Sequence, residues 1–145
     1  MIDELYQEII LDHSKRPRNT GRLENATAAA EGFNPLCGDR LTLELRIEDD
    51  RIEEAKFAGS GCAISTASAS LMTEVLKGRT KQEAEKLFER FHELLTSDAA
   101  DSSGLGKLAV FSGVREFPAR VKCATLAWHT LKAALENSRE KVSTE

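Results

Sequence analysis

The stretch LTLELRIEDDRIEEAKFAG, residues 41–59, decides the fold class of this chain of 145 residues. From Leu41 to Ile47, every second residue is leucine or isoleucine, and polar or charged residues lie between them. A period of two is typical of a strand that buries one face. Residues 41–48 are therefore predicted to form a β-strand that contributes to a hydrophobic core.

The second half of the stretch predicts a partner for this strand. Asp49 and Asp50 are of a type that turns favour, and Ala55 and Phe57 then lie on one face of a second strand. Ile52 is out of phase with them. The two strands and their short turn predict an antiparallel hairpin.

Further elements are predicted on both sides of the hairpin. Helices are expected over residues 2–14, 63–77, 80–95 and 108–114 and from 119 onward, a strand over 25–33, and a loop able to move over 96–107. We therefore expect a single domain, residues 1–145, of the α+β class. It would contain a small antiparallel sheet of about three strands, with the N-terminal helix and the C-terminal helices packed on it.

Composition and charge exclude several classes of function. A net charge of −4 gives no basic field to attract nucleic acid, and no Lys/Arg-rich block suggests an anionic membrane surface. No apolar run approaches the ~20 residues that a membrane span needs, and acids stand where a signal peptide carries positive charge. We expect a cytoplasmic protein that binds neither nucleic acid nor membranes.

Three cysteines, Cys37, Cys62 and Cys123, are the candidates for chemistry. An odd, widely spaced set in a reducing compartment argues against disulfides and favours metal binding or reactive thiols. Cys37 precedes the clear strand, Cys62 lies at a strand-to-helix turn, and Cys123 is expected in the first turn of the last helix. Helix N-termini favour thiolates at the latter two positions. Spacing alone also permits three small, buried apolar side chains.

Asp39 is the candidate for a fourth ligand. It follows Cys37 by two residues, so its carboxylate can be aimed at a metal that this cysteine binds. Three thiolates and one carboxylate complete the tetrahedral shell that zinc prefers. Gly38, Gly59 and Gly61 would let the backbone turn tightly beside a bulky ion. Taken alone, Asp39 is equally well explained as a turn residue bonded to its own backbone.

Three extended motifs surround the cysteines: NPLCGD at 34–39, GSGCAISTASASLM at 59–72 and RVKCATLAW at 120–128. With PRNTG at 17–21, they resemble the IscU/NifU-like family of iron–sulfur cluster assembly over nearly the whole chain. The resemblance implies a SufE/NifU-like fold.

The chain departs from the IscU branch of that family at two places, and at both it resembles the SufU branch. Lys122 stands where the IscU branch has a histidine before the third cysteine, and an ammonium group has no lone pair for a metal. The segment from about 98 to 118 is an addition between the second and third motifs. Proteins of the SufU branch resemble zinc-dependent sulfur carriers more than cluster scaffolds.

The resemblance implies a zinc-dependent sulfurtransferase that accepts persulfide sulfur from a PLP-dependent, SufS-like cysteine desulfurase, with Cys37 as the catalytic thiol. A histidine of the desulfurase would replace one thiolate on the zinc. The sulfur would pass to a downstream scaffold such as a SufBCD-type complex. Residues 17–21 and 96–118 are predicted partner contacts from their position alone. The implied ligands of the Zn²⁺ ion are Cys37, Asp39, Cys62 and Cys123.

Two alternatives stay open. The first is a scaffold on which a [2Fe–2S] cluster is assembled, because thiolates and a carboxylate also bind iron. The second is a structural zinc module whose acidic surface binds a partner. Other chemistries lack their motifs: there is no GxSxG, no dinucleotide-binding fingerprint, and Gly106-Lys107 is not followed by Ser or Thr. His13, His92 and His129 match no metal-ligand spacing.

Overall fold

The sheet of the protein is built mainly from the predicted hairpin and one further strand. The structure is a computed structural model that describes residues 4–35, 38–97, 105–136 and 142–143. Its strands are β1 (Ala28–Asn34), β2 (Asp39–Glu48), β3 (Arg51–Ser60) and β4 (Val142–Ser143). The first three pair antiparallel, which confirms the predicted sheet, and β4 adds an unpredicted parallel pairing with β1 in the order β3-β2-β1-β4.

The β2–β3 hairpin contains one irregularity that the sequence signals. Asp49 and Asp50 have φ values of 51° and 63°, and positive φ at both central residues is what a two-residue type I′ turn requires. The pairing register shifts between Arg46 and Ile47, and Ile52 then lies opposite Ile47. Because this bulge adds one residue to β3, Ile52 is buried although it is out of phase with the rest of its strand.

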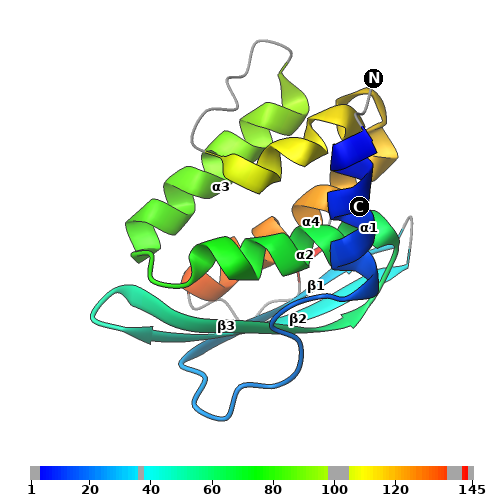
Figure 1. Ribbon diagram of the computed structural model, residues 1–145. Helices are drawn as coiled ribbons and strands as arrows, with labels where there is room; N and C mark the ends of the chain where they lie inside the picture. The colour runs from blue at the N-terminus through cyan, green and yellow to red at the C-terminus, as the bar shows by residue number, and fades with distance from the viewer. Residues whose placement is uncertain (1–3, 36–37, 98–104, 137–141, 144–145) are drawn as a thin grey trace.

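The helices that the structure describes gather over one face of the sheet (Figure 1). Two of them, α2 and α4, contact the strands directly, whereas the others pack around these two. This arrangement confirms the predicted α+β class with helices packed on a small sheet. The helical segments are α1 (Glu4–Lys15), α2 (Ala63–Leu76), α3 (Lys81–Thr96), the 3₁₀ segment η1 (Gly106–Glu116) and α4 (Pro118–Leu135).

Two helix boundaries differ from the prediction. The short helix expected over 108–114 is a longer 3₁₀ segment, η1. Helix α4 begins at Pro118, because proline has no N–H to leave unpaired and its fixed φ suits the first helical position. Cys123 therefore lies in the second turn of α4, and the prediction of the first turn is wrong. Most of the loop expected over 96–107 falls outside the described residues.

The core lies between the sheet and the helices. Leu43, at the centre of β2, is fully buried, as are Phe91 of α3 and Trp128 of α4. The rings of Phe91 and Trp128 stack with their centroids 4.8 Å apart. Helix α3 begins with a capping box: the Glu83 N–H donates to Thr80 Oγ1 (3.1 Å), and the Thr80 N–H donates to Glu83 Oε1 (3.0 Å).

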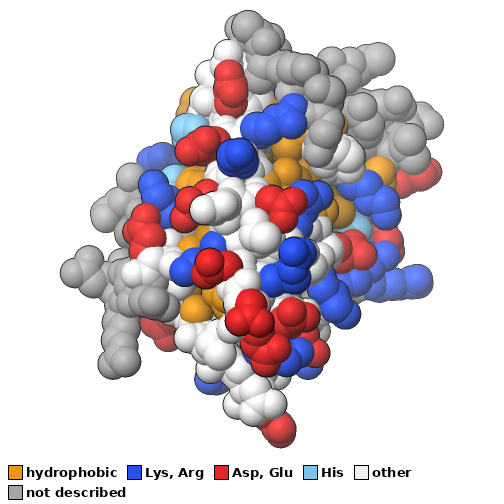
Figure 2. Space-filling view, turned by 90° about the vertical axis from the view of Figure 1, so that its left-hand side faces the viewer, with side chains coloured by type: hydrophobic (Ala, Val, Ile, Leu, Met, Phe, Trp, Pro, Cys, Tyr) orange, Lys and Arg blue, Asp and Glu red, His pale blue; other side chains and the backbone are white. Residues whose placement is uncertain are grey.

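The surface in Figure 2 mixes both signs of charge. Lysine and arginine side chains alternate there with aspartate and glutamate, and hydrophobic atoms are visible only in small areas between them. This face therefore offers no continuous basic surface of the kind that nucleic acid requires. None of the described helices combines the length and the hydropathy of a membrane span.

Candidate metal centre

Three of the four predicted ligands meet at one end of the sheet. Asp39 begins β2, Cys62 precedes α2, and Cys123 belongs to α4. A carboxylate oxygen and the two sulfur atoms lie within 4.8 Å of one another. The ligand atoms of one tetrahedral zinc ion, bonded at about 2.0–2.3 Å, lie about 3.3–3.8 Å apart, so these three atoms lie within about 1.5 Å of the spacing of a closed zinc site. The fourth predicted ligand, Cys37, lies outside the described residues.

Strand pairing places Asp39, the candidate ligand that comes from the sheet. Asn34, the last residue of β1, pairs with Asp39, the first residue of β2. Asp39 points to the same side as Leu41 and Leu43, because side chains on a strand alternate. That side faces the helices. The register thus brings the carboxylate to the N-terminal end of α2.

The Asp39 carboxylate is buried and held by two neutral donors. The Cys62 N–H donates to Oδ1 (2.8 Å), and Asn34 Nδ2 donates to Oδ2 (3.2 Å). Asp39 is 0% exposed, and it forms no ion pair within the part of the chain that the structure describes. A buried carboxylate without a countercharge is strongly unfavourable. A cation bound between it and the two sulfurs would supply that charge.

The two described cysteines differ in their surroundings. Cys62 is the N-cap of α2, and its Sγ accepts the Ser65 N–H at 3.4 Å. Cys123 is buried, and its Sγ accepts from Asn34 Nδ2 at 3.5 Å. Both sulfurs are thus already positioned as hydrogen-bond acceptors, as a metal-bound thiolate would be.

Gly61 lies against the carboxylate. A Cβ at this position would meet Asp39 Oδ1 at 2.6 Å, closer than any normal contact. The sequence predicts a glycine here to let the backbone turn beside an ion. The structure gives a more specific reason, because the missing side chain is what allows Asp39 to reach the Cys62 N–H.

A cavity of about 270 Å³ opens beside the site. It is bordered by Ser60 at the end of β3, by Ser65 and Thr66 in the first turn of α2, and by Arg40. Ser60 and Ser65 lie on either side of Cys62 in the chain. The N-terminal end of α2 is therefore bordered by open space whose lining combines these hydroxyl groups with apolar side chains such as Leu41 and Phe57.

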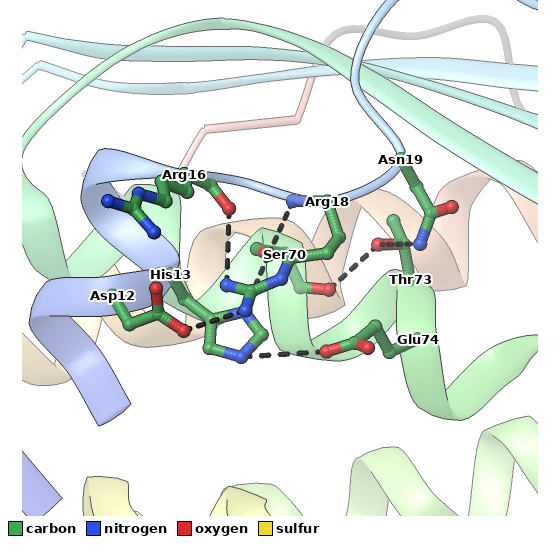
Figure 3. A network of polar contacts seen from close by, with 8 residues as sticks. All are labelled: Asp12, His13, Arg16, Arg18, Asn19, Ser70, Thr73 and Glu74. Atoms are coloured by element: carbon green, nitrogen blue, oxygen red, sulfur yellow. Dashed lines mark hydrogen bonds and ion pairs between the residues drawn. The ribbon is translucent and has the colours of Figure 1, made fainter. Parts of the chain in front are cut away.

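The PRNTG stretch is anchored to α2 next to this cavity (Figure 3). The Arg18 N–H donates to Ser70 Oγ (2.9 Å), and Asn19 Nδ2 donates to Thr73 Oγ1 (3.1 Å). The guanidinium of Arg18 forms an ion pair with Asp12 of α1 at 2.6 Å. These bonds give the stretch a structural role, and its contact with a partner stays a prediction.

His13 completes the same network from α1. It is 2% exposed; its Nδ1 lies 2.7 Å from Ser70 Oγ, and its Nε2 lies 3.5 Å from Glu74 Oε1. Burial lowers the pKa of His13, the charges of Arg18 and Lys107 lower it further, and Glu74 opposes them. Burial and the neighbouring His92 and Lys132 likewise lower the pKa of His129.

These histidines predict that acid destabilises the fold. A histidine whose pKa is lower in the folded state favours the folded state while it is neutral. That stability is fully present above the unfolded pKa of about 6.5 and is lost as the pH falls below it. We expect the free energy of unfolding of the metal-free protein to decrease from pH 7.5 to 5.5. Urea denaturation with a chelator present would measure it.

His13→Gln is expected to reduce this pH dependence, because glutamine does not titrate. His92→Gln provides the control, because it replaces a histidine that is exposed where His13 is buried. If the free energy of unfolding changed with pH by the same amount in wild type and His13→Gln, His13 would not be a source of the acid sensitivity.

Asn34 is the residue that the sequence reasoning missed. It lies inside the NPLCGD motif, but no role is predicted for it. Only the pairing of β1 with β2 reveals it, because following that pairing to the ends of the two strands places Asn34 opposite Asp39. Because the predicted strands end at 33 and begin at 41, this pair is not visible from periodicity.

Comparison with known proteins gives consistent results. Residues 5–124 match the family model described as the NifU-like N terminal domain. The zinc-dependent sulfurtransferase SufU of Bacillus subtilis (strain 168) is 43% identical over 132 residues, which cover 90% of this chain and 89% of the relative. The iron–sulfur cluster assembly scaffold protein IscU of Streptococcus pyogenes serotype M1 is 41% identical over 138 residues, which cover 94% of this chain and 86% of the relative.

A solved structure agrees with these relatives. The crystal structure of FiSufU from the thermophilic Fervidobacterium islandicum AW-1 superposes with a TM-score of 0.84 at 41% identity, and covers 88% of this chain and 94% of that one. Sequence and fold thus point to the same group of proteins.

Proposed function

The chain belongs to the NifU-like N-terminal domain family, and from this premise we propose that it is a zinc-dependent sulfurtransferase. It would accept persulfide sulfur from a cysteine desulfurase for iron–sulfur cluster assembly. One observation carries the proposal: a buried carboxylate, which forms no ion pair with any residue that the structure describes, converges with two thiol sulfurs within 4.8 Å. The SufU relative, 43% identical, is named for zinc-dependent sulfur transfer.

The donor set fits zinc. Zinc binds thiolates and carboxylates in a tetrahedral shell, and Cys62, Cys123 and Asp39 supply three such ligands. Cys37, two residues before Asp39, is the proposed fourth. Zinc, when bound, would keep these thiols deprotonated at neutral pH and shield them from oxidation.

Cys37 is the proposed sulfur acceptor. Its thiolate would attack the terminal sulfur of the desulfurase persulfide, forming a new S–S bond on Cys37. The S–S bond of the desulfurase persulfide breaks in the same step, and the desulfurase cysteine leaves as a thiolate. This is a thiol–disulfide type of exchange, so no external oxidant or reductant is needed.

The chain's own residues would keep the remaining ligands in place during this step. The Ser65 N–H and the dipole of α2 stabilise the Cys62 thiolate. The Cys62 N–H and Asn34 fix the carboxylate of Asp39. The partner desulfurase and the acceptor of the sulfur, such as a SufBCD-type scaffold, are part of the proposal.

The test measures metal content and desulfurase stimulation on the same purified sample, for wild type beside Cys37→Ala. We expect tightly bound zinc and stimulation of the desulfurase by wild type. The variant is expected to lose stimulation and to keep the circular dichroism spectrum of a folded protein.

Two outcomes would contradict the proposal. Iron with sulfide and no stimulation would favour a scaffold function, which the name of the IscU relative supports. Zinc with no stimulation by either protein would leave a structural metal site.

A further inference from the structure

We propose that Asn34 is a positioning residue of the metal centre, whose side-chain amide holds Asp39 and Cys123 in ligating positions. The inference rests on the proposed function, because it concerns the same site. It adds a residue that neither belongs to the predicted ligand set nor touches the metal directly.

The geometry that carries the proposal is a single amide between two ligands. Asn34 Nδ2 lies 3.2 Å from Asp39 Oδ2 and 3.5 Å from Cys123 Sγ. An amide NH₂ group has two N–H donors, so it can serve both acceptors at once. Asn34 is 0% exposed, and water does not compete for these donors. The amide therefore links a ligand from the sheet to a ligand from α4.

This link closes a chain of hydrogen bonds through all three described ligands. The Ser65 N–H donates to Cys62 Sγ, and the Cys62 N–H donates to Asp39 Oδ1. Asn34 then donates to the second oxygen of Asp39 and to Cys123. Side chains that donate hydrogen bonds to metal ligands orient those ligands, and their loss typically lowers metal affinity about 10–100-fold.

The chemistry of the site suits a neutral donor at this position. Three thiolates and a carboxylate carry four negative charges around a 2+ ion, so a further carboxylate would add repulsion. A lysine ammonium would compete with the metal for the same anions. Asparagine donates without adding either charge, because its amide is neutral.

The hydrogen bond from Asn34 to Cys123 Sγ keeps Cys123 bound to the metal. A hydrogen bond to a thiolate stabilises the negative charge that would otherwise attack an electrophile. Asn34 thereby keeps Cys123 less reactive during sulfur transfer. Without the amide, Cys123 should become an additional reactive thiol.

The test uses the full chain and two variants, Asn34→Ala and Asn34→Ser. Competition with a chromophoric chelator measures the dissociation constant for Zn²⁺, and we expect an increase of about 10–100-fold for alanine. Serine keeps one donor, so its increase should be smaller. Timed alkylation of the zinc-loaded proteins with iodoacetamide, mapped by mass spectrometry, should show earlier modification of Cys123 in the alanine variant.

Asn19→Ala is the matched control, because the Asn19 amide donates to Thr73 and not to a ligand. It should keep the wild-type dissociation constant and order of alkylation. Should the alanine variant fail to fold, the serine variant decides the comparison. Folded variants of Asn34 with wild-type values in both measurements would overturn the proposal. If wild type failed to stimulate the desulfurase, the proposed function would be overturned instead. The role of Asn34 at the metal would still be decided by the zinc dissociation constant and the order of alkylation.

Discussion

Replacing Asp39 with alanine is expected to raise the dissociation constant for zinc by at least about 100-fold. Loss of a residue that only orients the ligands typically costs about 10–100-fold in metal affinity, and Asp39→Ala removes a proposed ligand itself. It also removes the buried negative charge that makes a cation favourable at this site. The Cys62 N–H and the Asn34 amide would then lose their acceptor.

The measurement combines metal affinity with thermal stability. Chelator competition gives the dissociation constant directly. A ligand that binds only the folded state stabilises it by RT ln(1 + [L]/Kd), so with zinc well above both dissociation constants a 100-fold weaker constant removes about 2.7 kcal/mol of zinc-dependent stability. The rise in melting temperature on adding zinc should therefore shrink or disappear in Asp39→Ala.

Glu44→Ala is the matched control for this experiment. Glu44 is a second buried acid on β2, 8% exposed, but it lies on the opposite face and accepts from Arg22 Nε (2.7 Å) and the Leu23 N–H (3.2 Å). The bond from Arg22 lowers the pKa of Glu44. Glu44→Ala should reduce the stability of the fold both with and without zinc, and it should leave the dissociation constant for zinc unchanged. Wild-type zinc affinity in Asp39→Ala would remove Asp39 from the ligand set.

The sequence predicts the sheet well because its signals are local. Alternation from Leu41 to Ile47 and the turn at Asp49 and Asp50 depend on neighbours in the chain, and each of them forms. The bulge that buries Ile52 is the exception, because it depends on how two strands align. The sequence shows that Ile52 is out of phase with Ala55 and Phe57, but the alternation alone does not explain why.

The site is predicted as a set of residues and not as an arrangement. Motifs select Asp39, Cys62 and Cys123, and the fold brings them together from the start of β2, the N-cap of α2 and a position in α4 that is 61 residues beyond Cys62. Their supporting contacts require that fold. The amide of Asn34 meets Cys123 across 89 positions of sequence, and no local pattern encodes this contact.

The helix that carries Cys123 shows the same limit. Apolar spacing predicts its existence, but Pro118 sets its start and moves Cys123 from the first turn to the second. The position of Cys123 therefore owes less to the end of the helix dipole, which acts within the first turn. The Asn34 donor is the local interaction that the structure provides for this sulfur instead.

Replacing Gly59 with alanine is expected to destabilise the fold by about 2–6 kcal/mol, a large part of the stability of an ordinary domain. Gly59 has φ +152°, a conformation that residues with a side chain rarely adopt, and its added Cβ would lie 2.0 Å from the carbonyl oxygen of Arg40. The clashing atom belongs to the backbone of β2, which cannot move aside as the end of a flexible side chain can. Because Gly59 pairs with Leu41 in the β2–β3 ladder, the end of the sheet that bears Asp39 would have to move.

Urea denaturation of Gly59→Ala and Gly78→Ala, each with and without zinc, separates the two causes of this loss. Gly78 has φ +85°, and nothing lies within 4 Å of its added Cβ, so this variant reports backbone strain alone, about 1–2 kcal/mol. The excess loss in Gly59→Ala measures the clash between the strands. Zinc affinity should fall only in Gly59→Ala, because only that clash reaches Asp39. Equal losses of stability in the two variants would show that the close approach of β2 and β3 is not what requires a glycine at position 59.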